Sequence, residues 1–412
     1  MTDIAVLGAG MVGICTALEL QSRGHDVTVI DRVTPGSETS FGNAGIIQAE
    51  AAEPYQLPRN ALTMFRIALG RTNDVTWSLS GLLSMLPALQ QYYRYSSARS
   101  HAEISRHYAQ MTTQSTDDHQ PLIAAAEADY LISKTGLSCV YRDRRQLDND
   151  AADLERLTRQ YGVQSRVVDG EEYRREEPAL TNSIAGAIHW PQSWSCTNPG
   201  LLSQKYADLF RQRGGHVLRG NIERLLRCGN GWVVDGVSSG MRVKAEGIVV
   251  SLGPWSPQLL YPLGYRISMI YKRGYHAQYS GESRLHRPFL DVENGVVALS
   301  VEQGLRVTSG VALVGQNEKP DYRQLNRGVA GLSEIIELGP RTDEPIWFGT
   351  RPCLPDMLPL VGMAPRYPGL WFNFGHGHQG FTLGPSTATC LADAMDGKST
   401  ALLSALSPEN RV

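Results

Sequence analysis

The sequence lacks the features that mark three other classes of protein. No stretch reaches the ~18–20 apolar residues that a membrane-spanning helix needs. No lysine- or arginine-rich block stands out among its 39 basic and 41 acidic residues, and its six cysteines form no C-x-x-C pair. These absences argue against a membrane-spanning protein, a nucleic-acid partner, and a zinc site or disulfide framework. Scattered cysteines favour a reducing compartment, so we expect a cytoplasmic protein.

Neither the start of the chain nor its most apolar segment predicts a signal peptide or a membrane-spanning helix. The first strand, "IAVLGAG", begins without a basic region before it, so no signal peptide is expected. The segment "WSLSGLLSMLPAL", residues 77–89, is short and contains Pro87. It predicts a buried helix, with an amphipathic face resting on a membrane as the alternative. With 412 residues, 42% of them hydrophobic, the chain is long enough for two joined domains.

The first 32 residues contain a nucleotide-binding pattern. An apolar strand leads into the glycines of "GAGMVG", a helix follows, and a second strand ends at Asp31. Gly8 permits the tight turn, Gly10 lets the backbone approach a pyrophosphate, and Gly13 lets the helix pack closely on the sheet. Asp31, 18 residues after Gly13, is placed to accept from ribose hydroxyls, which disfavours NADP. The pattern predicts a dinucleotide without distinguishing FAD from NAD.

Three later segments favour FAD. The loop "SETSFGNAGIIQ" (37–48) suits close approach of the backbone to a flat ring, although a plain surface turn has the same composition. The segment "GIVVSLGPWSPQLL" (247–260) predicts a buried strand ending at Gly253, as any sheet would contain. The run 369–397 predicts a strand, a glycine loop and a helix from Thr382 to about Met395. A helix N-terminus there would stabilise negative charge on a reduced flavin. An NAD-linked dehydrogenase remains the weaker alternative.

Together these segments resemble the FAD-dependent D-amino acid oxidase superfamily, which includes glycine oxidase and sarcosine oxidase. Within it the chain is most similar to the bacterial D-amino acid dehydrogenase (small subunit) group. The resemblance spans nearly the whole chain. It rests on the segments "GAGMVG…VTVIDR", "ETSFGNAGII", "EPAL" (177–180), "SLGPWS", "KRGYH" (272–276), "FGTRPCLPDMLPLVG" (348–362) and "LWFNFGHGHQGFT".

The resemblance implies an α/β fold with two domains, of the glutathione reductase-2 type. A Rossmann-like FAD-binding domain would be discontinuous, and a second domain with an antiparallel sheet would hold the substrate. We expect residues 1–55, 155–260 and 340–412 in the FAD-binding domain. Residues 56–154 and 261–339 would form the substrate domain, with a helical insert at about 60–130. The site should lie between the two domains.

The resemblance also implies non-covalent FAD and a set of residues that hold it. The pyrophosphate would lie on the first glycines, the adenosine ribose on Asp31 and adenine against the backbone at Ile222. Cys353 is out of register with the cysteine that binds flavin covalently in some relatives. The residues implied for FAD are Gly8, Gly10, Met11, Val12, Gly13, Asp31, Arg32, Ser40, Asn43, Ala44, Gly45, Ile46, Ile222, Ser251, Gly253, Trp255, Gly377, Gln379, Gly380, Phe381 and Thr382.

The chemistry of amine oxidation predicts a carboxylate anchor rather than a catalytic triad. FAD supplies the hard step, so the protein must orient a neutral amine with its Cα near the flavin. Arg351 is the first candidate anchor, since a guanidinium grips a carboxylate with two parallel bonds. The alternative is a structural arginine that ties the loop to the sheet. Arg306 is a second candidate, for which a role as a strand-surface residue is favoured.

Three aromatic side chains complete the predicted catalytic set. Tyr275 and His276 lie in "RGYH", where the tyrosine hydroxyl would orient the substrate; packing of Tyr275 in the core is the alternative. His376 would tune the flavin or help to desolvate the amine, unless it serves only the loop. His376 and His378 lack a nearby carboxylate or cysteine, so no metal site is expected.

Two segments depart from the superfamily pattern. Met357 occupies the place of a glycine in the turn Pro-Asp-Gly, which puts the local turn in question. The stretch "SWSCTNPG", residues 193–200, replaces a glycine-aspartate segment. We expect it to face the substrate and alter specificity.

The predicted function is oxidative deamination of a (D-)amino acid to a 2-oxo acid and ammonia, with oxygen or a quinone as electron acceptor. Oxidation of an opine, hydroxyproline or N-methyl amino acid would need the same cofactor segments. A catalytically silent flavin subunit of a complex would need them too. Peripheral contact with the inner membrane and a partner subunit therefore stay open.

Overall fold

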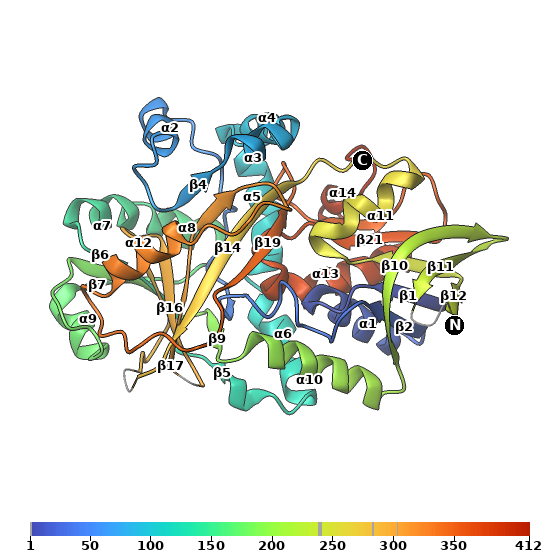
Figure 1. The fold of residues 1–412 in the computed structure, drawn as a ribbon, viewed down its shortest axis with the longest axis horizontal. Coiled ribbons are helices and arrows are strands. Elements are labelled where there is room, and N and C mark those ends of the chain that lie inside the picture. The colour runs from blue at the N-terminus through green and yellow to red at the C-terminus, as the bar shows by residue number, and fades with distance from the viewer. Residues whose placement is uncertain (1, 238–240, 282–283, 303) are drawn as a thin grey trace.

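Two large β-sheets organise the protein. The computed structural model describes residues 2–237, 241–281, 284–302 and 304–412. One sheet has eight strands, the other ten, and a small sheet of three strands lies apart from both. Figure 1 shows the large sheets side by side, the ten-stranded sheet on the left and the eight-stranded sheet on the right. The fold is therefore α/β with two domains, as predicted.

The eight-stranded sheet is built on the predicted nucleotide-binding strands. The central strands β1, β2, β13 and β21 pair in parallel, and β10 joins β2 in parallel before it continues into an antiparallel ribbon with β11. In spatial order, the strands are β12 (Met241–Ala245), β11 (Gly231–Val237), β10 (His216–Cys228), β2 (Asp26–Asp31), β1 (Asp3–Leu7), β13 (Gly247–Val250), β21 (Leu370–Phe374) and β20 (Leu360–Met363).

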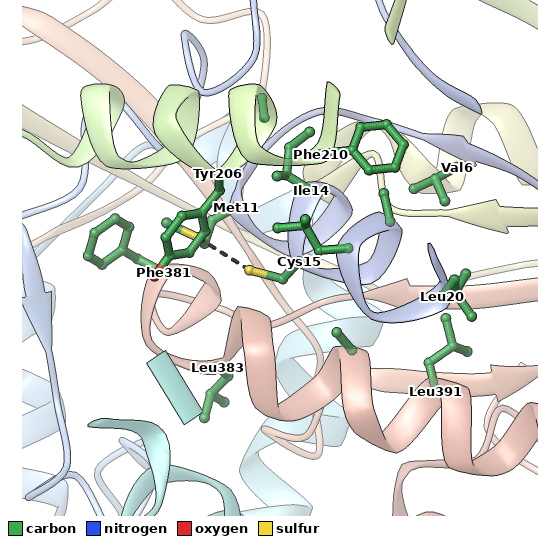
Figure 2. Packing of buried hydrophobic residues seen from close by; sticks show 14 of the residues in the cluster. Val6, Met11, Ile14, Cys15, Leu20, Tyr206, Phe210, Phe381, Leu383 and Leu391 are labelled. Carbon is green, nitrogen blue, oxygen red and sulfur yellow. Dashed lines mark hydrogen bonds between the residues drawn. The ribbon is translucent and has the colours of Figure 1, made fainter. Parts of the chain in front are cut away.

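Three helices cover one face of this sheet: α1 (Met11–Ser22), α10 (Pro199–Gln212) and α13 (Gly380–Met395). Figure 2 shows Ile14 and Cys15 of α1 between Leu383 of α13 and Tyr206 of α10. A Cβ atom at Gly384 would lie 3.0 Å from Met11 Cγ, so α1 and α13 cross closely. Burial of this continuous apolar layer stabilises the sheet and fixes the start of α1 and of α13 against it.

The ten-stranded sheet is mainly antiparallel, with parallel pairing of β15 with β6 and of β18 with β4. In spatial order, its strands are β4 (Val75–Trp77), β18 (Val311–Leu313), β14 (Ile270–Tyr279), β17 (Gly304–Thr308), β16 (Val296–Val301), β15 (Phe289–Asp291), β6 (Leu137–Tyr141), β8 (Gly186–Trp190) and β7 (Arg166–Asp169). A further strand, β19 (Trp347–Cys353), pairs antiparallel with β14.

This pairing differs from the predicted domain boundaries at two points. β7 and β8 lie within 155–260, and β19 lies within 340–412, yet all three belong to the ten-stranded sheet. The reason is that hydrogen bonding to β6 and β14 decides their sheet, and that pairing is not a local property of the sequence. The other boundaries remain predictions.

The remaining elements connect and cover these sheets. The small sheet contains β3 (Ile46–Ile47), β9 (Trp194–Cys196) and β5 (Ile132–Ser133). The other helices outside the insert are η1 (Asp129–Leu131), α7 (Arg144–Ala151), α8 (Leu154–Tyr161), α9 (Gly170–Glu176), η3 (Gly253–Trp255), α11 (Ser256–Leu260), η4 (Tyr261–Leu263), α12 (Arg323–Leu332) and α14 (Ala401–Leu406).

The predicted helical insert forms, interrupted by strand β4. Its helices are α2 (Ala61–Ala68), α3 (Leu79–Ser84), α4 (Leu86–Tyr95), α5 (Ala98–Thr112) and α6 (Ser115–Ala125). The buried helix predicted over residues 77–89 is wrong. This segment makes two short helices, and the side chains of Leu79 and Leu83 are 66% and 62% exposed. Gly81, Met85 and Ala88 are buried, the last two in a cluster with residues of β14, β18 and β19, so the segment is buried on one face only. Among the described residues, no helix is long and apolar enough to cross a bilayer.

Candidate active site

A cavity of about 1020 Å³ is lined from both large sheets. At one end its wall is the glycine turn after β1, and at the other it is the pair of strands β14 and β19. Cavities that hold drug-sized ligands measure roughly 300–1,000 Å³. This volume is at the top of that range, as a dinucleotide together with a small substrate requires.

The glycines of the first turn are explained by what a side chain would meet. Gly8 has a φ of +110°, and a Cβ atom there would lie 2.5 Å from the carbonyl oxygen of Ser251. A Cβ atom at Gly13 would lie 1.9 Å from the carbonyl oxygen of Gly8, so α1 packs directly on the turn. At Gly10 it would meet only Ser40 Oγ, at 3.3 Å. Gly10 therefore leaves backbone open to the cavity, whereas Gly13 lies behind its wall.

Two helix N-termini border the same cavity, although the Met11 N–H at the start of α1 already donates to Ser40 Oγ at 3.0 Å. Neither α1 nor α13 has a side-chain cap or an acidic residue in its first turn. Gly10, Met11 and Val12 line the cavity at the start of α1, and Gly380 and Phe381 line it at the start of α13. Free N–H groups and the helix dipole make such ends favourable for anions. They suit a pyrophosphate at α1 and negative charge on a ring at α13.

Beside the glycine turn, the cavity has the groups expected to bind a nucleoside. Asp31 lines it, and its carboxylate accepts from the Ala9 N–H at 2.6 Å, while burial raises the pKa of Asp31. The Arg32 guanidinium lies 4.2 Å from the ring centroid of Trp255. Ile222 lines the cavity where the pairing of β10 with β11 shifts register. This irregularity leaves backbone groups of β10 free to meet a base.

The loop between β2 and β3 forms the next part of the wall. Ser40, Asn43, Ala44 and Ile46 line the cavity, whereas Gly45 does not. Arg306 on β17 holds this loop by donating to the Phe41 and Asn43 carbonyl oxygens, at 3.3 and 3.2 Å. The expectation of a strand-surface role for Arg306 is therefore wrong. Its strand is buried along its whole length, and Arg306 itself is 4% exposed.

Buried polar atoms without partners show that the cavity fits a polar cofactor. Ser251 lines it, and its Oγ is buried without a hydrogen-bond partner among the described residues. Buried hydroxyls are nearly always hydrogen-bonded, so a bound group is the expected partner. Gly253, Trp255 and Gly377 also line the cavity.

Two of the residues implied for FAD lie behind the wall and support it. Gln379 Nε2 donates to Gln48 Oε1 at 3.0 Å, and Thr382 Oγ1 donates to the Ile46 carbonyl oxygen at 3.3 Å. They tie the start of α13 to the loop around β3. Burial raises the pKa of the Cys353 thiol, so this cysteine is not an activated nucleophile.

Arg351 reaches the substrate end of the cavity from β19. Its side chain crosses Gly274, where a Cβ atom would lie 2.6 Å from Arg351 Nη2. Nη1 donates to the Gly310 carbonyl oxygen at 3.1 Å, and Nη2 contacts that of Ser309 at 3.5 Å. No acidic group in the described part of the chain forms an ion pair with it, and burial lowers the pKa of the guanidinium. The remaining N–H donors are available to an anion in the cavity.

The other three predicted catalytic residues are placed differently. Tyr275 borders the cavity, but its ring packs against Tyr322 and its hydroxyl accepts from the Asp321 N–H at 3.3 Å. His276 is stacked on Trp347 with ring centroids 5.1 Å apart, and it does not line the cavity. His376 does line it, with Nε2 2.9 Å from Thr387 Oγ1.

Several cavity residues are absent from the predicted site. Lys272, Tyr55, His378 and Trp347 line the substrate end, as does Glu50, which accepts from the Ser193 hydroxyl. Lys272 could have been found from the alternation of side chains along a strand. Residues two apart on β14 share a face, so Lys272 lies on the same face as Gly274, which is at the cavity wall. Tyr55 and Trp347 carry no such signal, because their segments are distant in the chain.

The two departures from the superfamily pattern have clear structural outcomes. Met357 adopts a φ of +63°, the left-handed conformation that favours glycine, so the turn is kept despite the substitution. Residues 193–200 do not line the cavity, so the expectation that they face the substrate is wrong. They pair with β3 through β9, and Ser193 acts on the wall only through Glu50.

A glycine turn, two helix N-termini and an arginine on the wall of one large cavity fit a flavin-dependent oxidoreductase. A family model described as "FAD dependent oxidoreductase" matches residues 3–394. The chain belongs to this family, which uses FAD, so the NAD-linked alternative is wrong.

Solved structures share the fold over almost their full length. Glycine oxidase from Geobacillus kaustophilus is 19% identical with a TM-score of 0.75, covering 100% of this chain and 99% of that one. Iminodiacetate oxidase from Chelativorans sp. BNC1 is 19% identical with a TM-score of 0.74, covering 98% of each. L-proline dehydrogenase from P. horikoshii is 16% identical with a TM-score of 0.73, covering 99% and 96%. At these identities the likeness establishes the fold.

Proposed function

We propose that this protein catalyses FAD-dependent oxidative deamination of a D-amino acid, with Arg351 binding the substrate carboxylate. The observation that carries the proposal is a guanidinium at the cavity wall that, within the described residues, is hydrogen-bonded only to backbone carbonyl oxygens. The resemblance to the D-amino acid dehydrogenase small-subunit group supports the choice of enantiomer. Oxygen or a quinone would reoxidise the cofactor, which we expect to bind without a covalent link.

The reaction needs orientation and a neutral amine more than a strong base. When bound, FAD would supply the acceptor for a hydride from the substrate Cα, and water would hydrolyse the resulting imine to a 2-oxo acid and ammonia. Arg351 fixes one end of the substrate, which limits the positions open to Cα. Burial lowers the pKa of His376 and of His378 to about 3, so both are neutral near pH 7. They therefore bring no positive charge to the cavity, and Arg351 and Lys272 at its substrate end are the cations available to attract a carboxylate.

Replacement of Arg351 by methionine tests the anchor. Loss of a charge-assisted pair costs about 2–5 kcal/mol, so kcat/KM should fall by a factor on the order of 30 to several thousand. The measurement is the rate of flavin bleaching under anaerobic conditions with D-proline, D-alanine and their L-enantiomers. Arg366→Met is the control, because Arg366 also donates to a carbonyl oxygen, that of Gly264, but lies outside the cavity.

The Arg351 proposal would be contradicted by a variant that binds FAD and reacts as fast as the wild type. Bleaching by an L-enantiomer alone would reject the choice of D-amino acid but keep the anchor. A wild-type flavin that no amine bleaches would instead favour a silent subunit.

A second candidate function is oxidation of an opine, an amine that carries two carboxylates. Lys272 on β14 pairs directly opposite Arg351 on β19. Side chains at such positions share a face of the sheet, and like charges there are destabilising. Both side chains line the cavity, and neither has an ion-pair partner among the described residues. Lys272 Nζ donates only to the Tyr92 hydroxyl, at 3.2 Å. Two carboxylates would neutralise the pair.

The two candidates differ in their response to Lys272→Met. If the substrate is an opine, the wild type should bleach faster with the dicarboxylate, and the variant should lose most of that advantage while keeping its rate with D-alanine. If the substrate is a D-amino acid with one carboxylate, the variant should change both rates equally or neither. Hydroxyproline and N-methyl amino acids belong in the same panel, since each has one carboxylate.

A further inference from the structure

The surface formed by residues 55–99 is unusually apolar. We call it the insert surface; it includes α2, β4, α3 and α4. Of 17 large hydrophobic side chains exposed in the described structure, 11 belong to residues 55–95. The most exposed within the helices and beside them are Leu62, Phe65, Leu69, Leu79, Leu83 and Leu86. Figure 1 shows α2, α3 and α4 at the same edge of the molecule. Apolar patches of this kind mark sites of interaction.

The charge of the insert surface has one sign. Between residues 54 and 100 the sequence has five arginines and a single acidic residue, Asp74. All five arginine side chains are exposed, and none forms an ion pair within the described part of the chain. The five are Arg59, Arg66, Arg71, Arg94 and Arg99. The surface therefore combines apolar side chains with unpaired positive charge.

The insert surface is a built part of the fold rather than a loose loop. Asn60 caps α2 by accepting from the Leu62 N–H at 2.8 Å, although α2 has no buried residue. β4 pairs with β18 at the edge of the ten-stranded sheet. Trp77 Nε1 donates to the Ile67 carbonyl oxygen at 3.3 Å and ties α2 to β4. An ordered helix without a buried residue keeps its apolar side chains available to a partner.

We propose that the insert surface docks the protein on an anionic lipid bilayer. The leucines and Phe65 would enter the boundary between headgroups and acyl chains, and the arginines would bind lipid phosphates. A second copy of the chain fits this surface poorly, because a symmetric contact would bring five arginines against five. The arginines therefore favour an anionic partner, and the exposed leucines favour one that is apolar beneath its charged layer. An anionic lipid bilayer has both properties.

Docking would place the bilayer beside the wall of the cavity. Thr63 and Ile67 of α2 and Val75 of β4 line the cavity from inside, while their neighbours in the chain form the insert surface. This consequence rests on the proposed function: a lipid-soluble quinone would take two electrons and two protons from the reduced flavin and leave as the quinol. Docking itself needs neither substrate nor quinone.

Flotation of the holoprotein with vesicles tests the docking. The wild type should float with vesicles of phosphatidylcholine and phosphatidylglycerol, and salt should reduce the bound fraction. The triple variant F65S/L79S/L83S should bind about tenfold more weakly or worse, and R66Q/R71Q should lose much of the salt dependence. L226S/M363S is the matched control, because Leu226 and Met363 are exposed outside the insert surface. Retained flavin absorbance and circular dichroism verify that each variant is folded.

Three outcomes would overturn the proposal. The first is failure of the wild type to float with the anionic vesicles. The second is binding of the triple variant to these vesicles as strongly as the control binds. The third is a dimer in gel filtration that only the triple variant disrupts, which would assign the surface to a second copy. Flavin bleaching by amino acids is measured without vesicles, so failure of docking and failure of the proposed function are separate results.

Discussion

Gly10 and Gly13 belong to one motif but have different tolerance of a side chain. At Gly13 an added methyl group meets backbone, which has nowhere to move, whereas at Gly10 it meets the end of the Ser40 side chain. Gly13 therefore contributes to the packing of the fold, and Gly10 contributes to the space for the cofactor.

Gly13→Ala and Gly10→Ala should separate these contributions. Gly13→Ala should lower the free energy of unfolding by about 1–3 kcal/mol or prevent folding, as overpacking does. Gly10→Ala should fold with near wild-type stability without FAD but bind FAD more weakly. Urea unfolding of the apoproteins and titration with FAD measure the two effects. Equal losses of stability would show that both glycines serve packing.

Individual site residues were predictable where chemistry and motif agree. Arg351 was found because a guanidinium suits a carboxylate. Lys272 was missed because its significance depends on its pairing with a residue 79 positions later. Met357 was recognised as a departure, but the sequence could not show that the backbone keeps a left-handed turn at a cost of roughly 1–2 kcal/mol.

Three helices meet at one buried histidine. His119 of α6 contacts the Tyr206 hydroxyl of α10 through Nδ1 at 3.0 Å, and through Nε2 it contacts the Phe381 carbonyl oxygen of α13 at 2.9 Å. Burial lowers the pKa of His119 to about 4. The neutral ring thus joins the start of α13, which borders the cavity, to two other helices.

Acid should weaken this junction. The unfolded chain has a histidine pKa near 6.5, above the folded value of about 4, so His119 protonates more readily when unfolded. Its contribution is fully present above pH 6.5 and is lost as the pH falls toward 4, by up to about 3 kcal/mol. His119→Gln should reduce the fall in Tm between these pH values. An unchanged profile in the variant would show that other groups account for the acid sensitivity.

Elements were predictable where the pattern is local. The strands β1, β2 and β21 and helix α1 were expected from apolar runs and glycines, and they are present. Helix α13 begins at Gly380, two residues before the predicted start. The segment 77–89 was misjudged because its apolar composition did not show that only one face, with Met85 and Ala88, is covered by other elements. The sheet that β7, β8 and β19 join could not be predicted, because it depends on pairing with strands that are distant in the sequence.

The whole molecule has its main cavity where its two sheets meet, so FAD contacts should stabilise both together. Removal of FAD should therefore lower Tm by several degrees, with recovery on readdition. A ligand at 100 times its Kd adds about 2.7 kcal/mol. Calorimetry of apo- and holoprotein measures the shift. A Tm that is independent of FAD would show that FAD does not bind the folded protein in preference to the unfolded chain.

The hydrogen bonds from Arg306 to the carbonyl oxygens of Phe41 and Asn43 join β17 of the ten-stranded sheet to the cavity loop between β2 and β3. Any rearrangement of β17 that accompanies substrate binding would reach that loop without an intermediary. Linkage then runs in both directions: if substrate tightens the hold on FAD by some factor, FAD tightens the hold on substrate by the same factor. In such a protein, an empty substrate site favours dissociation of FAD, and an empty FAD site favours dissociation of the substrate. The fraction of protein that retains FAD then depends on the concentration of substrate.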